Sequence, residues 1–191
     1  MIYKRCTTPN AAFRQKQVEE CLLSSMADTP YQEITVTQLC QQMNMSRKAF
    51  YRYYSSKDAC LCSLLDRMLM ECRLFEIPSK NFHSDTSREI ASFLAFWKQK
   101  KNLLDVLIKN NLIDRLISRS IYFLVNEEQP AFHKNKIHDF FYDESVQLFS
   151  LTGIFAVIVQ WHITGYSLSN EEMARKMTRL LFQPMMHEQT S

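Results

Sequence analysis

Residues that interrupt helices are scarce in this chain. Only 2 glycines and 5 prolines occur among its 191 residues, and runs of β-branched residues are few. Because helices tolerate glycine and proline poorly, this scarcity predicts an almost entirely helical fold. A chain of this length buries a substantial core and forms either one domain or two small ones.

The sequence also lacks a long apolar run. The longest, Ile154 to Val159, has six residues, whereas a membrane-spanning helix needs about 18. The N-terminus has no apolar signal-peptide core, so we expect the chain to stay in the cytoplasm with no membrane partner. In that compartment its six cysteines are expected to be reduced thiols.

Patterns typical of metal sites and of catalysis are missing as well. Cys60, Cys62 and Cys72 do not have the paired spacing of zinc ligands, and Cys60 and Cys62 would point about 200° apart on a helix. His133 and His138 lie close together beside a proline-containing loop, where we expect no metal. The chain shows no Ser–His–acid arrangement, glycine-rich phosphate loop or paired-carboxylate motif. We therefore predict no metal, no cofactor and no catalytic site. A helical enzyme with an unrecognised site is the least favoured alternative.

The segment from Thr35 to Asp58 carries the strongest positive signal. Thr35 is placed to cap a short helix. The apolar face of that helix consists of Val36, Leu39, Cys40 and Met43. Asn44 follows, and asparagine tolerates the left-handed backbone conformation that ends a helix in a sharp turn. Ser46 is a second N-cap, so the segment predicts two helices joined by a turn of about three residues, which is the geometry that places a helix in a DNA major groove.

The second of these helices carries side chains suited to reading bases. Arg47 and Lys48 lie on its first turn, which is the part of a recognition helix that reaches base edges. An arginine that grips guanine with two hydrogen bonds contributes roughly 1–3 kcal/mol of discrimination. Ala49 offers a methyl group to thymine, and Phe50 is expected to point inward as part of the core.

Hydroxyl and ammonium donors around the same helix suit phosphate oxygens, which fix register without reading sequence. The residues expected to hold the DNA backbone are Thr35, Ser46, Tyr51, Tyr53 and Lys57. The full predicted set of DNA-binding residues is Thr35, Thr37, Gln38, Ser46, Arg47, Lys48, Ala49, Tyr51, Arg52, Tyr53 and Lys57. Charge agrees with this placement, because residues 1–60 hold eight Lys/Arg and five Asp/Glu, whereas residues 61–191 hold fifteen of each.

The segment resembles the DNA-binding domain of the tetracycline-repressor (TetR) family of bacterial transcriptional regulators. That family's pattern is a threonine-capped helix, a turn with a small residue and glycine, a serine that starts the recognition helix, and an aromatic pair followed by a lysine and an acid. The matching residues here are Thr35, Val36, Leu39, Cys40, Met43, Asn44, Met45, Ser46, Tyr51, Tyr53, Tyr54, Lys57, Asp58 and Leu61. Asn44 replaces the usual turn glycine. Lys48 replaces a glycine of many members, which exchanges close backbone approach for a cation.

The rest of the sequence predicts further amphipathic helices. Helices are expected at Asn10 to Ala27, Lys57 to about Ile77, Thr86 to about Lys100, Leu103 to Lys109, Leu112 to about Glu127 and Ile137 to about Gly165, with a last helix capped by Asn170. The expected fold is all-α. Residues 1–66 would form a three-helix, helix-turn-helix DNA-binding domain and residues 67–191 a larger helical regulatory and dimerisation domain.

The long helix ending near Gly165 has apolar residues on two sides, and both sides must be buried. In the TetR family the last two helices of each subunit form a four-helix dimer interface. The resemblance therefore implies a homodimer with contacts from Leu151, Ile154, Ile158, Trp161, Met173, Met177, Leu180 and Leu181. The alternative is that both apolar stripes are ordinary core.

The resemblance also implies a small-molecule effector bound in the helical domain. The candidate lining residues are Met68, Phe93, Trp97, Tyr122, Phe123 and Phe149, although plain core is the favoured interpretation of each. A homodimer would read a palindromic DNA operator, and the effector would release it by changing the separation of the recognition helices. The expected function is thus a ligand-responsive regulator, most simply a repressor. The alternative is a TetR-like co-activator that works through protein–protein contacts and has lost or altered operator binding.

Overall fold

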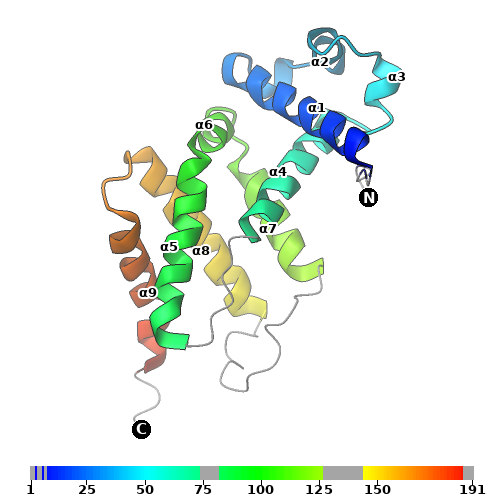
Figure 1. Ribbon diagram of the computed structural model, residues 1–191. Helices are drawn as coiled ribbons and strands as arrows, with labels where there is room; N and C mark the ends of the chain where they lie inside the picture. The colour runs from blue at the N-terminus through cyan, green and yellow to red at the C-terminus, as the bar shows by residue number, and fades with distance from the viewer. Residues whose placement is uncertain (1–2, 4–5, 7, 74–81, 127–143, 187–191) are drawn as a thin grey trace. The chain divides into compact units, whose positions relative to one another are not determined.

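The protein is helical throughout the part that the computed structural model describes, which comprises residues 3, 6, 8–73, 82–126 and 144–186 (Figure 1). That part contains nine α-helices and one 3₁₀ turn, and these confirm the predicted all-α class. An isolated antiparallel β-bridge joins Tyr3 to Tyr54. Within the described residues, none of the helices combines the length and the hydrophobicity that crossing a lipid bilayer requires.

The helices fall into two compact units, of which the first contains Met1–Met70 and Asp105–Arg119. Its elements are α1 (Pro9–Asp28), the 3₁₀ turn η1 (Tyr31–Glu33), α2 (Val36–Gln42), α3 (Arg47–Phe50), most of α4 (Lys57–Arg73), the end of α6 (Lys101–Lys109) and the first half of α7 (Ile113–Asn126). Its core consists of Val18, Leu22, Met26, Leu39, Phe50, Leu61, Leu64, Leu65, Leu107 and Leu116, all buried. The domain boundary that the sequence predicts between residues 66 and 67 stays a prediction.

A buried asparagine fastens the end of α6 to the end of α1. Asn110 Nδ2 donates to the carbonyls of Met26 (3.1 Å) and Val106 (2.8 Å), and its Oδ1 accepts the backbone N–H of Tyr31 (2.6 Å). These bonds offset the cost of burying an amide group. They also fix the start of the segment that leads into α2.

The second unit contains Glu71–Leu104 and Ser120–Ser191. Its principal helices are α5 (Phe82–Gln99), α8 (Glu144–Ile163) and α9 (Asn170–Met186), and α5 packs against both α8 and α9 (Figure 1). The buried ring of Trp97 lies 5.4 Å from the Phe96 ring and 5.2 Å from the Phe155 ring, measured between centroids. Aromatic packing thus joins α5 to α8.

The end of α8 has the predicted glycine stop. Gly165 has a φ of 69°, and the next residue, Tyr166, donates its backbone N–H to the Trp161 carbonyl (2.9 Å). This is the left-handed cap that glycine favours. The predicted start of this helix near Ile137 lies outside the described residues, as do His133 and His138.

Candidate nucleic-acid interface

A complete capping box begins α2. Thr35 Oγ1 accepts the backbone N–H of Gln38 (3.2 Å), and Gln38 Oε1 accepts the backbone N–H of Thr35 (2.7 Å). Both N–H groups would otherwise lack a partner at the helix N-terminus. The predicted Thr35 cap is therefore confirmed. The side chains of Thr35, Thr37 and Gln38 are exposed, as contact with DNA requires.

The turn between α2 and α3 depends on Asn44. Its φ is 47°, its N–H bonds to the Gln41 carbonyl (3.1 Å), and the N–H of Met45 bonds to the Cys40 carbonyl (2.9 Å). These two bonds form the motif that closes a helix through a left-handed residue. Ser46 Oγ then accepts the N–H of Ala49 (3.1 Å) and caps α3. The predicted helix–turn–helix is confirmed in its local geometry.

Helix α3, the predicted recognition helix, is short and presents its cations outward. Arg47 and Lys48 are exposed, Ala49 is half-buried, and Phe50 is fully buried, which confirms its inward direction. The guanidinium carbon of Arg47 lies 5.9 Å from the centroid of the Tyr51 ring. Such a contact steers the long arginine side chain along the outer face of the helix. Both cations are accessible to a partner.

The residues after α3 divide between the surface and the interior. Tyr51 and Arg52 are exposed, and Tyr53 is half-buried. Tyr54 is 1% exposed, and its hydroxyl lies 3.1 Å from both the Gln15 carbonyl and Glu19 Oε1. Burial raises the pKa of the Tyr54 phenol above its ordinary value. Tyr54 therefore anchors from within the end of residues 47–53, which we call the recognition segment.

Lys57 has an internal role that its sequence position did not predict. Its Nζ donates to the carbonyls of Tyr31 and Ile34, the latter at 2.7 Å, and lies 4.2 Å from the centroid of the Tyr31 ring. Burial lowers the pKa of this ammonium. Lys57 therefore fastens the start of α4 to the segment before α2. A phosphate contact by the same group remains a prediction and would compete with these carbonyls.

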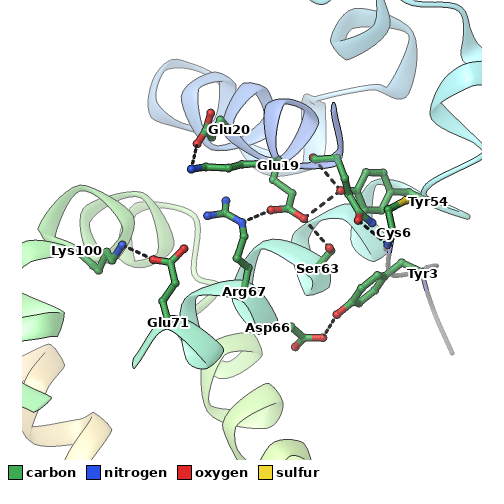
Figure 2. Close-up of polar contacts among 12 residues, drawn as sticks. Tyr3, Cys6, Glu19, Glu20, Tyr54, Ser63, Asp66, Arg67, Glu71 and Lys100 are labelled. Atoms are coloured by element: carbon green, nitrogen blue, oxygen red, sulfur yellow. Dashed lines mark hydrogen bonds and ion pairs between the residues drawn. The ribbon is translucent and has the colours of Figure 1, made fainter. Parts of the chain in front are cut away.

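A network of polar side chains around the buried carboxylate of Glu19 joins α1 to α4 (Figure 2). We call it the Glu19 cluster, and it comprises Glu19, Tyr54, Ser63 and Arg67. Glu19 is 2% exposed. Its Oε1 accepts the hydroxyls of Ser63 (2.6 Å) and Tyr54 (3.1 Å), and its Oε2 lies 2.6 Å from Arg67 Nε. A buried carboxylate needs such donors to offset its loss of hydration. The Glu19 cluster therefore holds Tyr54, the residue that follows the recognition segment, against α1 and α4.

A second network surrounds the buried carboxylate of Asp66. We call it the Asp66 cluster, and it comprises Asp66, Tyr3 and Arg119. Both carboxylate oxygens of Asp66 accept from Arg119, Oδ1 from Nε and Oδ2 from Nη2, each at 2.6 Å. The Tyr3 hydroxyl also donates to Oδ2 (Figure 2). Burial disfavours the charged guanidinium of Arg119, but its bonds to Asp66 outweigh this and raise its pKa. The bidentate pair fixes α7 to α4.

The predicted effector-pocket residues do not all occupy one kind of environment. Phe93 and Trp97 are neighbours in the second unit, with centroids 6.3 Å apart. Trp97 and Phe123 are buried, whereas Tyr122 is half exposed and Phe149 is 77% exposed. Met68 is buried in the first unit. A pocket lined by these residues remains a prediction.

The predicted dimer residues divide into buried and accessible groups. Ile158, Trp161, Met173 and Met177 are buried within the second unit. Leu151 and Ile154 are half-buried, Leu180 is 64% exposed, and the side chain of Leu181 lies outside the described residues. The sequence did not single out Ile163, and it considered Phe149 only as a pocket residue. Both are exposed on α8.

No set of three or more metal-binding side chains converges among the residues that the structure describes. Cys60, Cys62 and Cys72 are buried on α4. They pack there as small apolar side chains.

Comparison with known proteins supports a regulatory family. No protein-family model matches the chain. The chain is 29% identical over 86 residues to the HTH-type transcriptional regulator EthR of Mycobacterium tuberculosis and to that of Mycobacterium bovis. The match covers 45% of this chain and 40% of the length of those relatives.

A solved structure supports the fold. The fatty acid degradation regulator FadR from Bacillus halodurans aligns with 93% of this chain and 96% of its own, with a TM-score of 0.52 and 14% identity. The chain is thus distantly similar to TetR-family regulators, which supports the predicted resemblance at the family level. The relatives are transcriptional regulators rather than enzymes.

Proposed function

We propose that the protein is a sequence-specific DNA-binding transcriptional regulator, acting in the cytoplasm as a homodimeric repressor that a small molecule releases. The observation that carries the proposal is the pair of exposed cations, Arg47 and Lys48, at the start of a capped helix that follows a left-handed turn. Side chains in this position reach base edges when the helix enters the major groove. The distant relatives, which are themselves regulators, support the same function.

Within this function, Arg47, Lys48 and Ala49 read bases, while hydroxyl and ammonium groups around them hold phosphates. The backbone-contacting set is Thr35, Ser46, Tyr51, Tyr53 and Lys57, and the predicted DNA-binding set is completed by Thr37, Gln38 and Arg52. Replacing Arg47 with alanine should relax sequence preference, because a bidentate contact to guanine discriminates by roughly 1–3 kcal/mol. Equal losses of affinity on every sequence would contradict base reading by Arg47.

Dimerisation is supported by the accessible apolar surface of the last two helices. Phe149, Gly153, Ala156 and Ile163 are exposed on α8, and Leu180 is exposed on α9. Small residues at two of these positions let a partner helix approach closely. A two-fold dimer would read two half-sites about one helical turn of DNA apart. The variant Ile163→Glu should yield monomers in sedimentation, whereas Gln99→Glu, at an exposed position on α5 outside this face, should not.

The effector is expected to be apolar, because the second unit is rich in buried aromatic side chains. One similar structure is that of a fatty acid degradation regulator, so fatty acids are the first compounds to test. A ligand that favours the DNA-free conformation would weaken operator binding by its difference in affinity for the two states.

Selection of binding sites from a random oligonucleotide pool tests the proposal most directly. Enrichment of a palindromic sequence, with half-sites about one turn apart, would support DNA reading and a dimer together. Failure to enrich any sequence with a folded protein would contradict operator binding and favour the co-activator alternative. That alternative is motivated by Lys48, which stands where many family members have glycine, and by Asn44, which replaces the usual turn glycine.

A further inference from the structure

We propose that the Asp66 cluster couples DNA binding at α3 to the conformation of α7, with Asp66 and Arg119 as the coupling pair and Tyr3 as the connection to the recognition segment. The inference rests on the proposed DNA-binding function. It assigns a regulatory role to residues that make no predicted contact with DNA.

The first step concerns α7, which is shared along its length between the two units. Ile113–Arg119 belongs to the first unit, and the continuation from Ser120 belongs to the second. Arg119 is therefore the last residue of the first-unit segment. A helix transmits displacement along its axis because its backbone is fully hydrogen-bonded. Any change in the second half of α7 thus reaches Arg119 without an intervening loop.

The second step concerns the bond between Arg119 and Asp66. Asp66 is 2% exposed, and two parallel hydrogen bonds of 2.6 Å fix both the position and the orientation of the guanidinium. A buried carboxylate that loses one partner cannot turn to water instead. The pair therefore has one strongly favoured arrangement, and α7 cannot shift relative to α4 while it persists.

The third step leads from Asp66 to the recognition segment. The Tyr3 hydroxyl donates to Asp66 Oδ2, and the Tyr3 backbone pairs with Tyr54 in an antiparallel bridge. The Tyr3 and Tyr54 rings lie 6.5 Å apart between centroids, and the Tyr54 ring lies 5.5 Å from that of Phe50, the last residue of α3. A contiguous chain of packed and hydrogen-bonded groups therefore runs from α7 to α3. Figure 2 shows Tyr3 between Tyr54 and Asp66.

Because coupling between two sites is reciprocal, DNA can serve as the probe even though the effector is unknown. The experiment measures amide hydrogen exchange of residues 120–126 in the full chain, with and without the DNA selected from the random pool. In the wild type, DNA should change exchange there on the order of five-fold or more, the lower end of ordinary site-to-site coupling. No change at 120–126 upon saturating DNA binding would overturn the inference while leaving the proposed function intact. Failure to select any DNA would overturn both.

Variants of the pair make the test specific. Arg119→Met leaves Asp66 buried without its cation and is at risk of unfolding. The double variant Asp66→Asn with Arg119→Met removes both charges and is the main test, with helical circular dichroism as the check of folding. It should bind the selected DNA with unchanged sequence preference and lose the exchange response at 120–126. Arg119→Lys, which keeps the charge but not the bidentate geometry, should lose part of it.

The control is Lys16→Met, which breaks an exposed ion pair between Lys16 and Glu20 (3.7 Å) and should keep the full response. A wild-type exchange response in the folded double variant would overturn the inference, because the ion pair would then carry no coupling. A response lost equally in Lys16→Met would also overturn it.

Discussion

The two units of this protein hold their helices together by different physical means. In the first unit, buried polar groups fix helix against helix, through the carboxylates of Glu19 and Asp66 and the amide of Asn110. In the second unit, the rings of Trp97 and Phe155 join α5 to α8, and the ammonium of Lys98 lies 5.4 Å from the centroid of the Trp161 ring.

The difference matters because polar and apolar contacts constrain structure differently. Hydrogen bonds to a buried carboxylate specify the identity and direction of each partner, so a unit built on them favours one arrangement. Aromatic packing depends mainly on volume and tolerates some repacking. A DNA-reading unit needs its recognition helix in one orientation, whereas a ligand-responsive unit needs an interior that can adapt. The contrast therefore fits the proposed roles, in which the first unit reads DNA and the second responds to a ligand.

The largest expected effect is the loss of volume in the second unit. Phe155 is 1% exposed, so Phe155→Ala should lower the free energy of unfolding by about 3–5 kcal/mol, whereas Phe155→Leu should cost about 1 kcal/mol. Urea denaturation followed by tryptophan fluorescence would measure both, because the two tryptophans of the chain lie in this unit. Equal losses for Leu and Ala would contradict a core governed by volume.

In the first unit, loss of charge at constant volume should itself lower the free energy of unfolding. Glu19→Gln keeps the shape of the side chain but removes the charge that holds Arg67. We expect a loss of about 2 kcal/mol, since hydrogen bonds to charged groups contribute roughly 1.5–3 kcal/mol. The matched control is Glu20→Gln, whose side chain is 55% exposed and should cost less than about 0.5 kcal/mol. Urea denaturation followed by circular dichroism gives both values. Equal losses of unfolding free energy in the two variants would contradict a stabilising role for the buried Glu19 charge, and with it the contrast between the units.

Lys57 tests whether a side chain serves the fold or the DNA. Because its ammonium bonds to the carbonyls of Tyr31 and Ile34, Lys57→Met should destabilise the protein by about 1–2 kcal/mol. If Lys57 also contacts phosphate, the same variant should weaken binding to all sequences and flatten the salt dependence by about one unit. Gel shifts over a salt series separate the two roles. Unchanged stability of Lys57→Met would contradict a stabilising role for the hydrogen bonds between Lys57 and these two carbonyls.

The sequence predicted local features of the first unit well, because each depended on neighbouring residues. The Thr35 and Ser46 caps, the left-handed Asn44 and the inward Phe50 all follow from preferences within four residues. Their spacing also matched a known family pattern. The all-α class followed from the scarcity of glycine and proline.

Long-range pairing was beyond the reach of a single sequence. Asp66 is an acid within an apolar stretch of α4, which signals a buried charge, but its partner Arg119 lies 53 residues away. Nothing in the spacing of those residues identifies the pair. The same holds for α8, where apolar residues occur on two sides of the helix. Tertiary packing, such as that of α5 against α8, decides that Ile158 and Trp161 are buried while Phe149 and Ile163 are exposed.

The smallest predicted effect concerns the turn that sets the recognition helix. At a φ of 47°, Asn44→Ala should cost about 1 kcal/mol because a Cβ without a local polar group is strained in the left-handed region, whereas Asn44→Gly should leave stability nearly unchanged. Thermal denaturation measures both. Specific DNA affinity should follow the same order, since the turn sets the angle at which α3 leaves α2. If Asn44→Gly kept its stability but lost specific binding, the asparagine side chain itself would take part in recognition. The turn would then belong to the DNA interface and not only to the scaffold beneath it.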